Sequence, residues 1–314
     1  MNRSYTSFKL SIVVPTFNED GNIEPLYLSL LLQMEKLHVS NFEIIYVNDG
    51  SSDGSLEVIK RLSSQDERVR FVSFSKNFGH QFALKAGLDF ASGDAVISMD
   101  ADLQHPPELI ADLLEKWEEG YQVVYTIRKN EKGISWLKRA TSKLFYYLLN
   151  KISEYKVIEG AADFRLMDRK VVGELKKIND QELFFRGIIP SLGYRQTPVY
   201  FEPNQRFSGS TKYSMKKMVK LAITGIVSTS VKPLYFSIYI GAIMALLAFM
   251  YGIYAIYIAV FTDKAIAGWT STLVSVVFIG GVQLMVMGII GLYIGKVFIN
   301  SKGRPNYIVD ETNI

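Results

Sequence analysis

Two long stretches without a charged residue constrain the fold of this chain more than any other feature of its sequence. Residues 234–261 and 265–295 contain no Asp, Glu, Lys or Arg, and the charged residues between them are Asp263 and Lys264. A helix crosses a bilayer with about 20 apolar residues, and both stretches exceed that length. The pattern predicts a transmembrane hairpin over 233–299, with spans at about 234–261 and 267–295, rather than two helices buried in a soluble core.

Basic residues gather on one side of the predicted hairpin, since the connecting loop has a single lysine. The flanking set is Lys212, Lys216, Lys217, Lys220 and Lys232 before the first span, and Lys296, Lys302 and Arg304 after the second. Cytoplasmic segments next to membrane spans are enriched in Lys and Arg. We therefore expect a multi-pass protein of the inner (plasma) membrane, with its globular part and both termini in the cytoplasm.

The part before residue 233 has the pattern of an α/β domain. Apolar runs such as "KLSIVVP", "FEIIYVND", "VRFVSFS", "DAVISMD" and "YQVVYTI" alternate with stretches of helical period. This alternation predicts a mostly parallel, Rossmann-like sheet with helices on both faces. Ligands of such sheets bind beyond the carboxyl ends of the strands. Because no G-x-G-x-x-G follows the first strand and no Walker A sequence occurs, dinucleotide and P-loop sites are disfavoured.

Two basic amphipathic segments are predicted between this domain and the hairpin. Residues 134–152 place Leu137, Leu144 and Leu148 near one face, and residues 212–231 lead directly into the first span. Such helices can lie in a membrane interface, or they can pack on the core of their own domain. The expected organisation is a cytoplasmic domain over 1–210, an interface helix over 211–232, the hairpin, and a cytoplasmic tail over 300–314.

Composition excludes several kinds of site. The chain has no cysteine, so disulfides and thiolate metal sites are absent, and its three histidines (His38, His80 and His105) are too scattered for a zinc site. The net charge of +4 is modest, and clustered basic residues suit an anionic surface or ligand better than nucleic acid. Loop structure explains His105, while His80 follows Gly79 at a helix start and could touch a ligand.

The stretch "SMDADLQHPP" places two carboxylates and an amide where the fourth predicted strand ends. Asp100 and Asp102 point to the same side at i and i+2 on a strand end. Two close carboxylates repel each other unless they share a cation, and oxygen ligands favour Mg²⁺ or Mn²⁺ completed by phosphate oxygens. Gln104 can add a neutral oxygen. The alternative is a pair of solvated turn residues.

Polar residues also follow the first two predicted strands. Asp49, in "YVNDGSSDGS", ends the second strand and could accept a hydrogen bond from a base or ribose, although a turn with a helix cap accounts for Gly50 and Ser51. In "VVPTFNEDGNI", Pro15 ends the first strand and Glu19 precedes a helix.

Taken together in this order, the motifs "VVPTFNE", "NDGSSDGS", "MDADLQHPPE" and "RFSGSTKYS" resemble the inverting family-2 glycosyltransferases that act on polyprenyl phosphates. That group includes the dolichyl-phosphate mannose synthases and the bacterial undecaprenyl-phosphate glycosyltransferases. The segment "SKNFGHQFALKAGL" and the hairpin look most like the bacterial bactoprenol glucosyltransferase branch. The resemblance covers nearly the whole chain and implies a GT-A fold, a nucleotide-sugar donor and a divalent metal, Mg²⁺ or Mn²⁺.

The resemblance also implies roles for individual residues. The donor's nucleoside would contact Pro15, Phe17, Glu19 and Asp49. The metal would be held by Asp100, Asp102 and Gln104, and the diphosphate would be contacted by Arg206 and Lys212. The chain departs from processive polysaccharide synthases of the same superfamily, because it has no Q-x-x-R-W sequence and only two predicted spans, which counts against chain elongation.

The acceptor side is assigned from charge. Arg128 and Arg139 are candidates for the acceptor phosphate, with lipid headgroup contact or a plain surface charge as the alternative. Asp163 is the candidate if a base or an orienting carboxylate is needed, and an ion pair with Arg165 is the structural alternative. One direct displacement at the anomeric carbon would invert its configuration.

The expected function is transfer of one sugar, glucose from UDP-glucose, to undecaprenyl phosphate, giving a lipid-linked sugar for cell-surface glycan modification. Alternatives are another donor, GDP-mannose or a UDP-linked aminosugar, and a non-catalytic membrane scaffold or flippase partner that retains the fold. Glycines in the second span (Gly280, Gly281, Gly288, Gly291 and Gly295) suggest close helix packing within the hairpin or between the protomers of a homo-oligomer.

Overall fold

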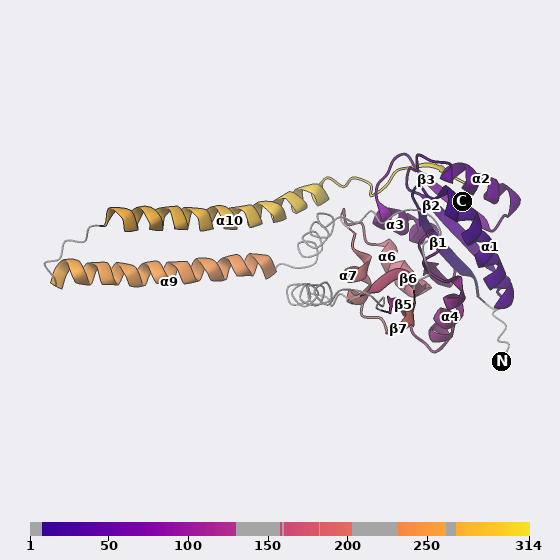
Figure 1. Ribbon diagram of the computed structural model, residues 1–314, viewed down its shortest axis with the longest axis horizontal. Helices are drawn as coiled ribbons and strands as arrows, with labels where there is room; N and C mark the ends of the chain where they lie inside the picture. Colours follow the sequence, from indigo (N-terminus) through magenta and orange to yellow (C-terminus); the bar gives the residue numbers. More distant parts are fainter. Residues whose placement is uncertain (1–7, 130–157, 159, 182, 203–231, 262–267) are drawn as a thin grey trace.

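The computed structural model describes residues 8–129, 158, 160–181, 183–202, 232–261 and 268–314 (Figure 1). Both predicted amphipathic segments lie outside these residues, as do three predicted site residues, Arg139, Arg206 and Lys212.

An eight-stranded mixed sheet forms the frame of the globular part, in the order β7-β5-β6-β4-β1-β2-β3-β8. The strands are β1 (Leu10–Thr16), β2 (Phe42–Asn48), β3 (Val69–Phe74), β4 (Ala95–Ser98), β5 (Val123–Arg128), β6 (Ala161–Asp168), β7 (Gln196–Phe201) and β8 (Val309–Thr312). β1 pairs in parallel with β2 and β4, and β2 with β3. β6 lies antiparallel between β4 and β5, so β6 begins at the edge where its neighbours end.

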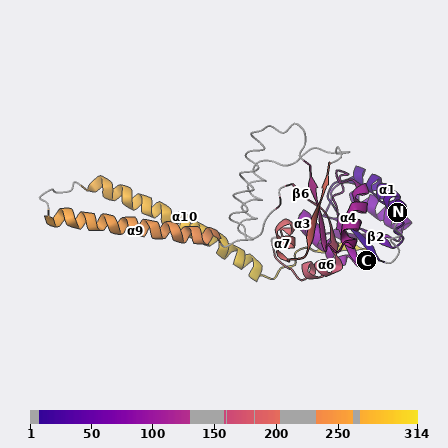
Figure 2. The ribbon, with the colours of Figure 1, turned by 90° about the horizontal axis from the view of Figure 1, so that it is seen from below.

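Helices cover both faces of the sheet, as Figure 2 shows with the sheet seen edge-on. One face carries α1 (Asp20–Lys36), α2 (Ser55–Gln65) and α4 (Ile110–Glu118), the last preceded by a 3₁₀ turn at Pro107–Leu109; the other carries α3 (His80–Phe90), α6 (Arg169–Lys176) and α7 (Phe185–Ser191). Because side chains alternate along a strand, Ile12 and Ile44 belong to the first core, and Val13 and Ile45 to the second. Strands buried on both faces explain the continuous apolar runs in the sequence.

Two long helices project from the globular part as a pair (Figure 1), α9 (Lys232–Phe261) and α10 (Trp269–Ser301). Among the described residues, one helical segment, Phe278–Ser301, is long and apolar enough to cross a membrane, and α9 contains a shorter apolar segment, Ser237–Tyr251. The structure thus gives one candidate span where the sequence predicts two.

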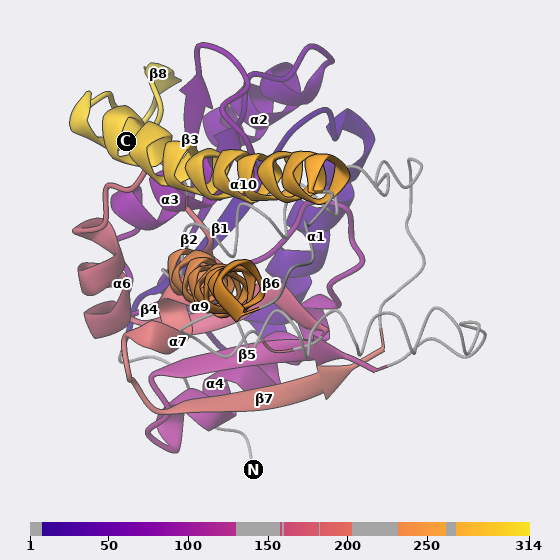
Figure 3. The ribbon, with the colours of Figure 1, turned by 90° about the vertical axis from the view of Figure 1, so that its left-hand side faces the viewer.

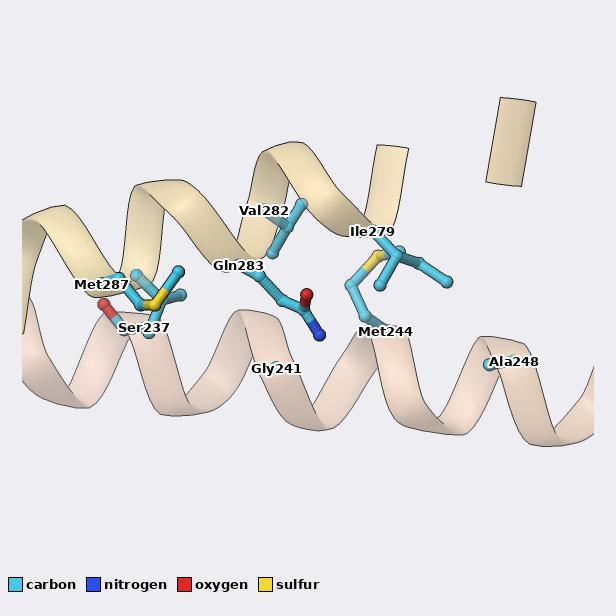
Figure 4. A pocket seen from close by; sticks show the side chains of 9 residues that line it. Ser237, Gly241, Met244, Ala248, Ile279, Val282, Gln283 and Met287 are labelled. Carbon is cyan, nitrogen blue, oxygen red and sulfur yellow. The ribbon is translucent and has the colours of Figure 1, made fainter. Parts of the chain in front are cut away.

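An open pocket of about 500 Å³ with a mostly apolar lining lies between the two helices. Figure 4 shows the Gln283 side chain pointing from α10 toward Gly241 of α9. The predicted role of the α10 glycines within the hairpin is not seen in the described residues, because a Cβ added at Gly280, Gly281, Gly288, Gly291 or Gly295 would meet no atom within 4 Å. A homo-oligomer that uses these glycines stays a prediction.

After α10 the chain returns to the globular part. The sequence predicted only a cytoplasmic tail over 300–314 and no strand within it. β8 pairs antiparallel with β3 at the edge of the sheet, near the C label in Figure 3. Lys60 on α2 and Glu311 on β8 form an ion pair across this edge. Both ends of the projecting helix pair are therefore attached to the same domain.

Helix α3 packs on β1 so closely that only a glycine fits at one position. A Cβ at Gly87 would lie 2.1 Å from Val13 Cγ1, and the branched Val13 side chain has little freedom to move. We expect Gly87→Ala to lower the free energy of unfolding by about 1–3 kcal/mol through overpacking. Urea titration of the purified protein in detergent measures this change.

Gly173→Ala in α6 is the matched control, because a Cβ there would meet no atom within 4 Å. Alanine is the better helix former, so this variant is expected to gain about 0.5–1 kcal/mol. Equal stability of the two variants would contradict the close approach of α3 to β1.

Candidate functional site

The carboxyl ends of β1, β2 and β4 meet the start of β6 at one edge of the sheet. Ser98, the last residue of β4, pairs with Arg165 of β6, and its hydroxyl donates to the Asp163 carbonyl oxygen at 2.6 Å. This register places the residues after β4 beside Asp163. The topology therefore brings Asp163 of β6 close to the loop that carries Asp100 and Asp102, although they are far apart in the sequence.

The loop after β4 is organised around His105, whose ring is fully buried and stacks on Phe164 with 5.1 Å between ring centroids. The Asp100 backbone N–H donates to His105 Nδ1 at 3.2 Å. Because Nδ1 accepts, the proton of the neutral ring sits on Nε2, 3.7 Å from Asp100 Oδ2. Burial lowers the pKa of His105, against the opposing charge of Asp100, and keeps the ring neutral.

The same loop presents both carboxylates of the predicted D-x-D motif. Asp102 is buried and accepts the Gln104 backbone N–H at 3.2 Å, whereas the Asp100 side chain is 32% exposed. Leu103, directly after Asp102, has a φ of 60°, in the left-handed region that non-glycine residues seldom adopt. The backbone of this loop is therefore locally strained beside the two carboxylates.

Asp163 is the buried counter-charge of a cationic cluster. Arg186 of α7 binds it with two hydrogen bonds, Nε to Oδ1 at 3.1 Å and Nη2 to Oδ2 at 3.0 Å, and Arg165 Nη2 lies 3.3 Å from Oδ1. Burial alone would raise the pKa of Asp163, but the Arg186 charge, the nearby His80 and Arg165 outweigh it and hold the pKa well below its usual range. The predicted ion pair with Arg165 is therefore present.

His80, the first residue of α3, lies between the carboxylates. Its Nε2 is 3.7 Å from Asp100 Oδ1 and 3.7 Å from Asp163 Oδ2, although the ring is 41% exposed. Desolvation would lower the pKa of His80, but the nearby carboxylates of Asp163 and Asp100 outweigh it and raise the pKa to about 9. His80 is thus a cation at neutral pH. Its predicted contact with a ligand stays a prediction.

Asp49 joins the end of β2 to the loop before α3. Its Oδ1 accepts the Phe78 N–H at 2.7 Å, and its Oδ2 accepts the Gly79 N–H at 2.9 Å. Burial raises the pKa of Asp49, and these two backbone donors oppose the shift. The carboxylate therefore shapes the loop, and its predicted contact with a base or ribose stays a prediction.

The other predicted donor residues lie near the same edge. Pro15 is in buried β1, Phe17 just beyond it is 41% exposed, and the Glu19 backbone N–H donates to Ser55 Oγ at 2.9 Å. Asn18 and Ser52 cross-link the loops after β1 and β2, because Ser52 N–H donates to Asn18 Oδ1 at 2.8 Å. The predicted contacts of Pro15, Phe17 and Glu19 with a nucleoside stay predictions.

Arg128 ends β5 with its Nη2 3.5 Å from His105 Nε2, so this predicted acceptor residue lies beside the D-x-D loop. Arg186 was missed by sequence reasoning, because nothing in "LFFRGII" marks it and its partner Asp163 lies 23 residues away.

The donor set fits a hard divalent cation. No group of three His, Cys, Asp or Glu side chains that could hold a metal occurs among the described residues. Mg²⁺ and Mn²⁺ are commonly bound through one or two carboxylates, with water and substrate phosphates as the other ligands, and Asp100 and Asp102 offer such a pair.

The charge of Asp163 should govern stability at low pH. We expect Asp163→Asn to cost about 3 kcal/mol at pH 7, because it leaves the buried Arg165 uncompensated. An Asp titrates near pH 4 in the unfolded chain. Since folding depresses the pKa, this stability is present above pH 4 and is lost as pH falls through the lower folded-state pKa.

Urea titrations at pH 7, 5.5 and 3 test this dependence, with Asp112→Asn, exposed on α4, as the matched control. The gap between wild type and Asp163→Asn should be similar at pH 7 and 5.5 and smaller at pH 3. A gap that widens toward pH 3 would show that Asp163 is not an ionised partner of the arginines.

Comparison with known proteins adds independent evidence. The sequence profile of glycosyl transferase family 2 matches residues 11–176. A bactoprenol glucosyl transferase of Shigella phage SfV is 42% identical over 301 residues, 96% of this chain and 98% of that protein. A prophage bactoprenol glucosyl transferase homolog of Escherichia coli K12 is 41% identical over the same shares of the two chains.

Among solved structures, a mannosyltransferase from Pyrobaculum calidifontis in complex with GDP-Man and Mn²⁺ matches with a TM-score of 0.48 at 14% identity, over 94% of this chain and 87% of that one. The full-length relatives confirm the family resemblance seen in the motifs. The chain belongs to glycosyl transferase family 2 and is a glycosyltransferase with a GT-A-like α/β fold.

Proposed function

We propose that this protein transfers one glucose from UDP-glucose to undecaprenyl phosphate and so makes a lipid-linked sugar for cell-surface glycan modification. Relatives named bactoprenol glucosyl transferases, about 41% identical over almost the whole chain, support transfer of glucose to a polyprenyl phosphate. The observation that carries the proposal is the loop after β4, which holds Asp100 and Asp102 at the edge where the strands of the sheet end.

The donor side of the reaction depends on the carboxylates. Asp100 and Asp102, with Gln104, would hold Mg²⁺ or Mn²⁺ there, and Arg206 and Lys212 would contact the diphosphate. When bound, the metal supplies positive charge that stabilises the leaving diphosphate. His105 holds the Asp100 backbone in place, and protonated His80 limits the repulsion between Asp100 and Asp163.

The acceptor side needs positioning more than proton transfer. A phosphate monoester has a second pKa of about 6 and is largely dianionic near neutral pH, so it is already a nucleophile. Asp163 is a poor base, because Arg186 and Arg165 hold its pKa low and occupy its oxygens. We assign it an orienting role, and we propose Arg128 and Arg139 as contacts of the acceptor phosphate.

Direct attack by the acceptor phosphate oxygen breaks the bond between the anomeric carbon and the diphosphate oxygen, and the nucleoside diphosphate leaves. A single displacement inverts the anomeric carbon, so an α-linked donor gives a β-linked lipid product. An α-linked product would exclude this course.

The membrane arrangement is proposed from both helices of the projecting pair. Exposed large apolar side chains cover them, including Phe249 and Tyr239 on α9 and Leu284 and Val297 on α10. Such an apolar surface needs a lipid environment or a partner. We propose that α9 and α10 form a two-span hairpin, with the globular part in the cytoplasm next to the lipid-borne acceptor.

A donor panel tests the proposed reaction. Purified protein with undecaprenyl phosphate and Mg²⁺ or Mn²⁺ is expected to give lipid-extractable label from UDP-glucose, and none after EDTA. Label from GDP-mannose or a UDP-aminosugar alone would replace the donor assignment. No label from any donor would favour a membrane scaffold.

Asp102→Asn should lower the transfer rate by about 10²-fold or more, the effect of removing one electrostatic stabiliser. Glu115→Gln, which neutralises an exposed carboxylate on α4, is the matched control and should keep wild-type activity. Full activity of Asp102→Asn would exclude the metal assignment.

The natural absence of cysteine makes the membrane arrangement testable with single-cysteine variants. Gly268→Cys, before α10, should react with an impermeant maleimide in intact cells, whereas Ser64→Cys on α2 should react only after permeabilisation. Equal labelling of the two variants in intact cells would exclude the two-span hairpin.

A further inference from the structure

The segment that follows α10 contacts the domain at two separate places. Farther along the chain, Asn313 Oδ1 accepts the Phe71 N–H at 2.7 Å, and Asn313 Nδ2 donates to the Val69 carbonyl at 3.2 Å. These contacts hold β8 on the first half of β3. Nearer to α10, Tyr307 and Ile308 reach the end of β3 and the loop that follows it.

Tyr307 supports that loop through an aromatic chain. Its ring stacks on Phe74 with 5.0 Å between centroids and 16° between planes, and Phe74 meets Phe78 edge-on at 5.6 Å. The next residue, Ile308, accepts the Ser75 N–H at 3.2 Å. The Tyr307 hydroxyl donates to Asp89 Oδ2 at 3.0 Å, which also ties the segment to α3.

The opposite side of the loop is pressed against the end of β2. Gly50 has a φ of +63°, and a Cβ there would lie 2.4 Å from the Lys76 carbonyl carbon. Phe78 and Gly79 donate their N–H groups to Asp49, and Gly79 immediately precedes His80. Residues 75–79 therefore lie between the candidate donor edge and the segment that returns from α10.

We propose that Tyr307 is a positioning residue for donor binding: through Phe74 and Phe78 it holds loop 75–79 against Asp49, in the shape that places His80 at the candidate donor edge. The proposal deepens the proposed function and rests on it for the identity of the donor. It makes the strength of nucleotide binding depend on a residue six positions beyond the end of a projecting helix.

Removal of the Tyr307 ring should weaken donor binding without changing the chemical step. In the full-length protein in detergent, we expect Tyr307→Ala to raise the KM for UDP-glucose about tenfold, with kcat and the KM for undecaprenyl phosphate within about twofold of wild type. UDP binding measured by calorimetry with Mg²⁺ should weaken by a similar factor.

Two further variants separate positioning from stability. Tyr307→Phe keeps the stacked ring and loses the Asp89 hydrogen bond, so it should restore most of the donor affinity. Asn313→Ala removes two hydrogen bonds of the same segment away from the loop, so it should lower the thermal midpoint and leave the KM for UDP-glucose unchanged.

An unchanged KM for UDP-glucose in Tyr307→Ala, beside an active wild type, would overturn the proposal, as would an equal rise of that KM in Asn313→Ala. Failure of the proposed function looks different. The wild type would then give no lipid-linked sugar, and the positioning role would still be tested by calorimetry with UDP and GDP. If the wild type bound neither nucleotide, both proposals would fall.

Discussion

The carboxylate of Asp163 is buried, and the positive charges of Arg165, Arg186 and His80 stabilise its ionised form. The three cations come from different parts of the chain: His80 opens α3, Arg165 belongs to β6 and Arg186 to α7. A buried carboxylate of this kind is costly unless its oxygens are well paired. Asp163 therefore links α3, through His80, and α7, through Arg186, to strand β6 of the sheet. The Asp100 loop is placed by the same strand register, through Ser98 and the Asp163 backbone.

The local pattern of apolar residues was sufficient to predict the parallel strands of the sheet. The strands buried on both faces read as continuous apolar runs, and the D-x-D motif followed the fourth of them, as the sequence indicated. The antiparallel position of β6 between β4 and β5 had no local signature in the sequence, since it depends on contacts with strands that are distant along the chain. The position of His80 between Asp100 and Asp163 had no local signature either, since a lone histidine is informative only when its neighbours in space are known. Loop structure accounts for His105, as expected.

Acidic and cationic side chains lie side by side at the edge where β1, β2 and β4 end. In the proposed function, the carboxylates of Asp100 and Asp102 would hold a divalent cation at this edge, and anionic substrates would approach it. Protonated His80 and the arginines around Asp163 limit the repulsion among the acidic groups. Neutral His105, stacked against Phe164, serves a different purpose, because it fixes backbone geometry without adding charge. Two histidines a few ångströms from one aspartate thus differ in protonation because their partners differ.

The pairing of β8 with β3 also sets an order of events during synthesis. Thr312 bonds to the Phe71 carbonyl across 241 residues of sequence, so this side of the sheet cannot be completed until the ribosome has passed the codon for Thr312. By then both projecting helices have already been made. In the interval β3 is an open edge, which is an aggregation hazard for a nascent chain. The sheet is therefore completed only after both projecting helices have been synthesised, and the last strand to be made covers the open edge of β3.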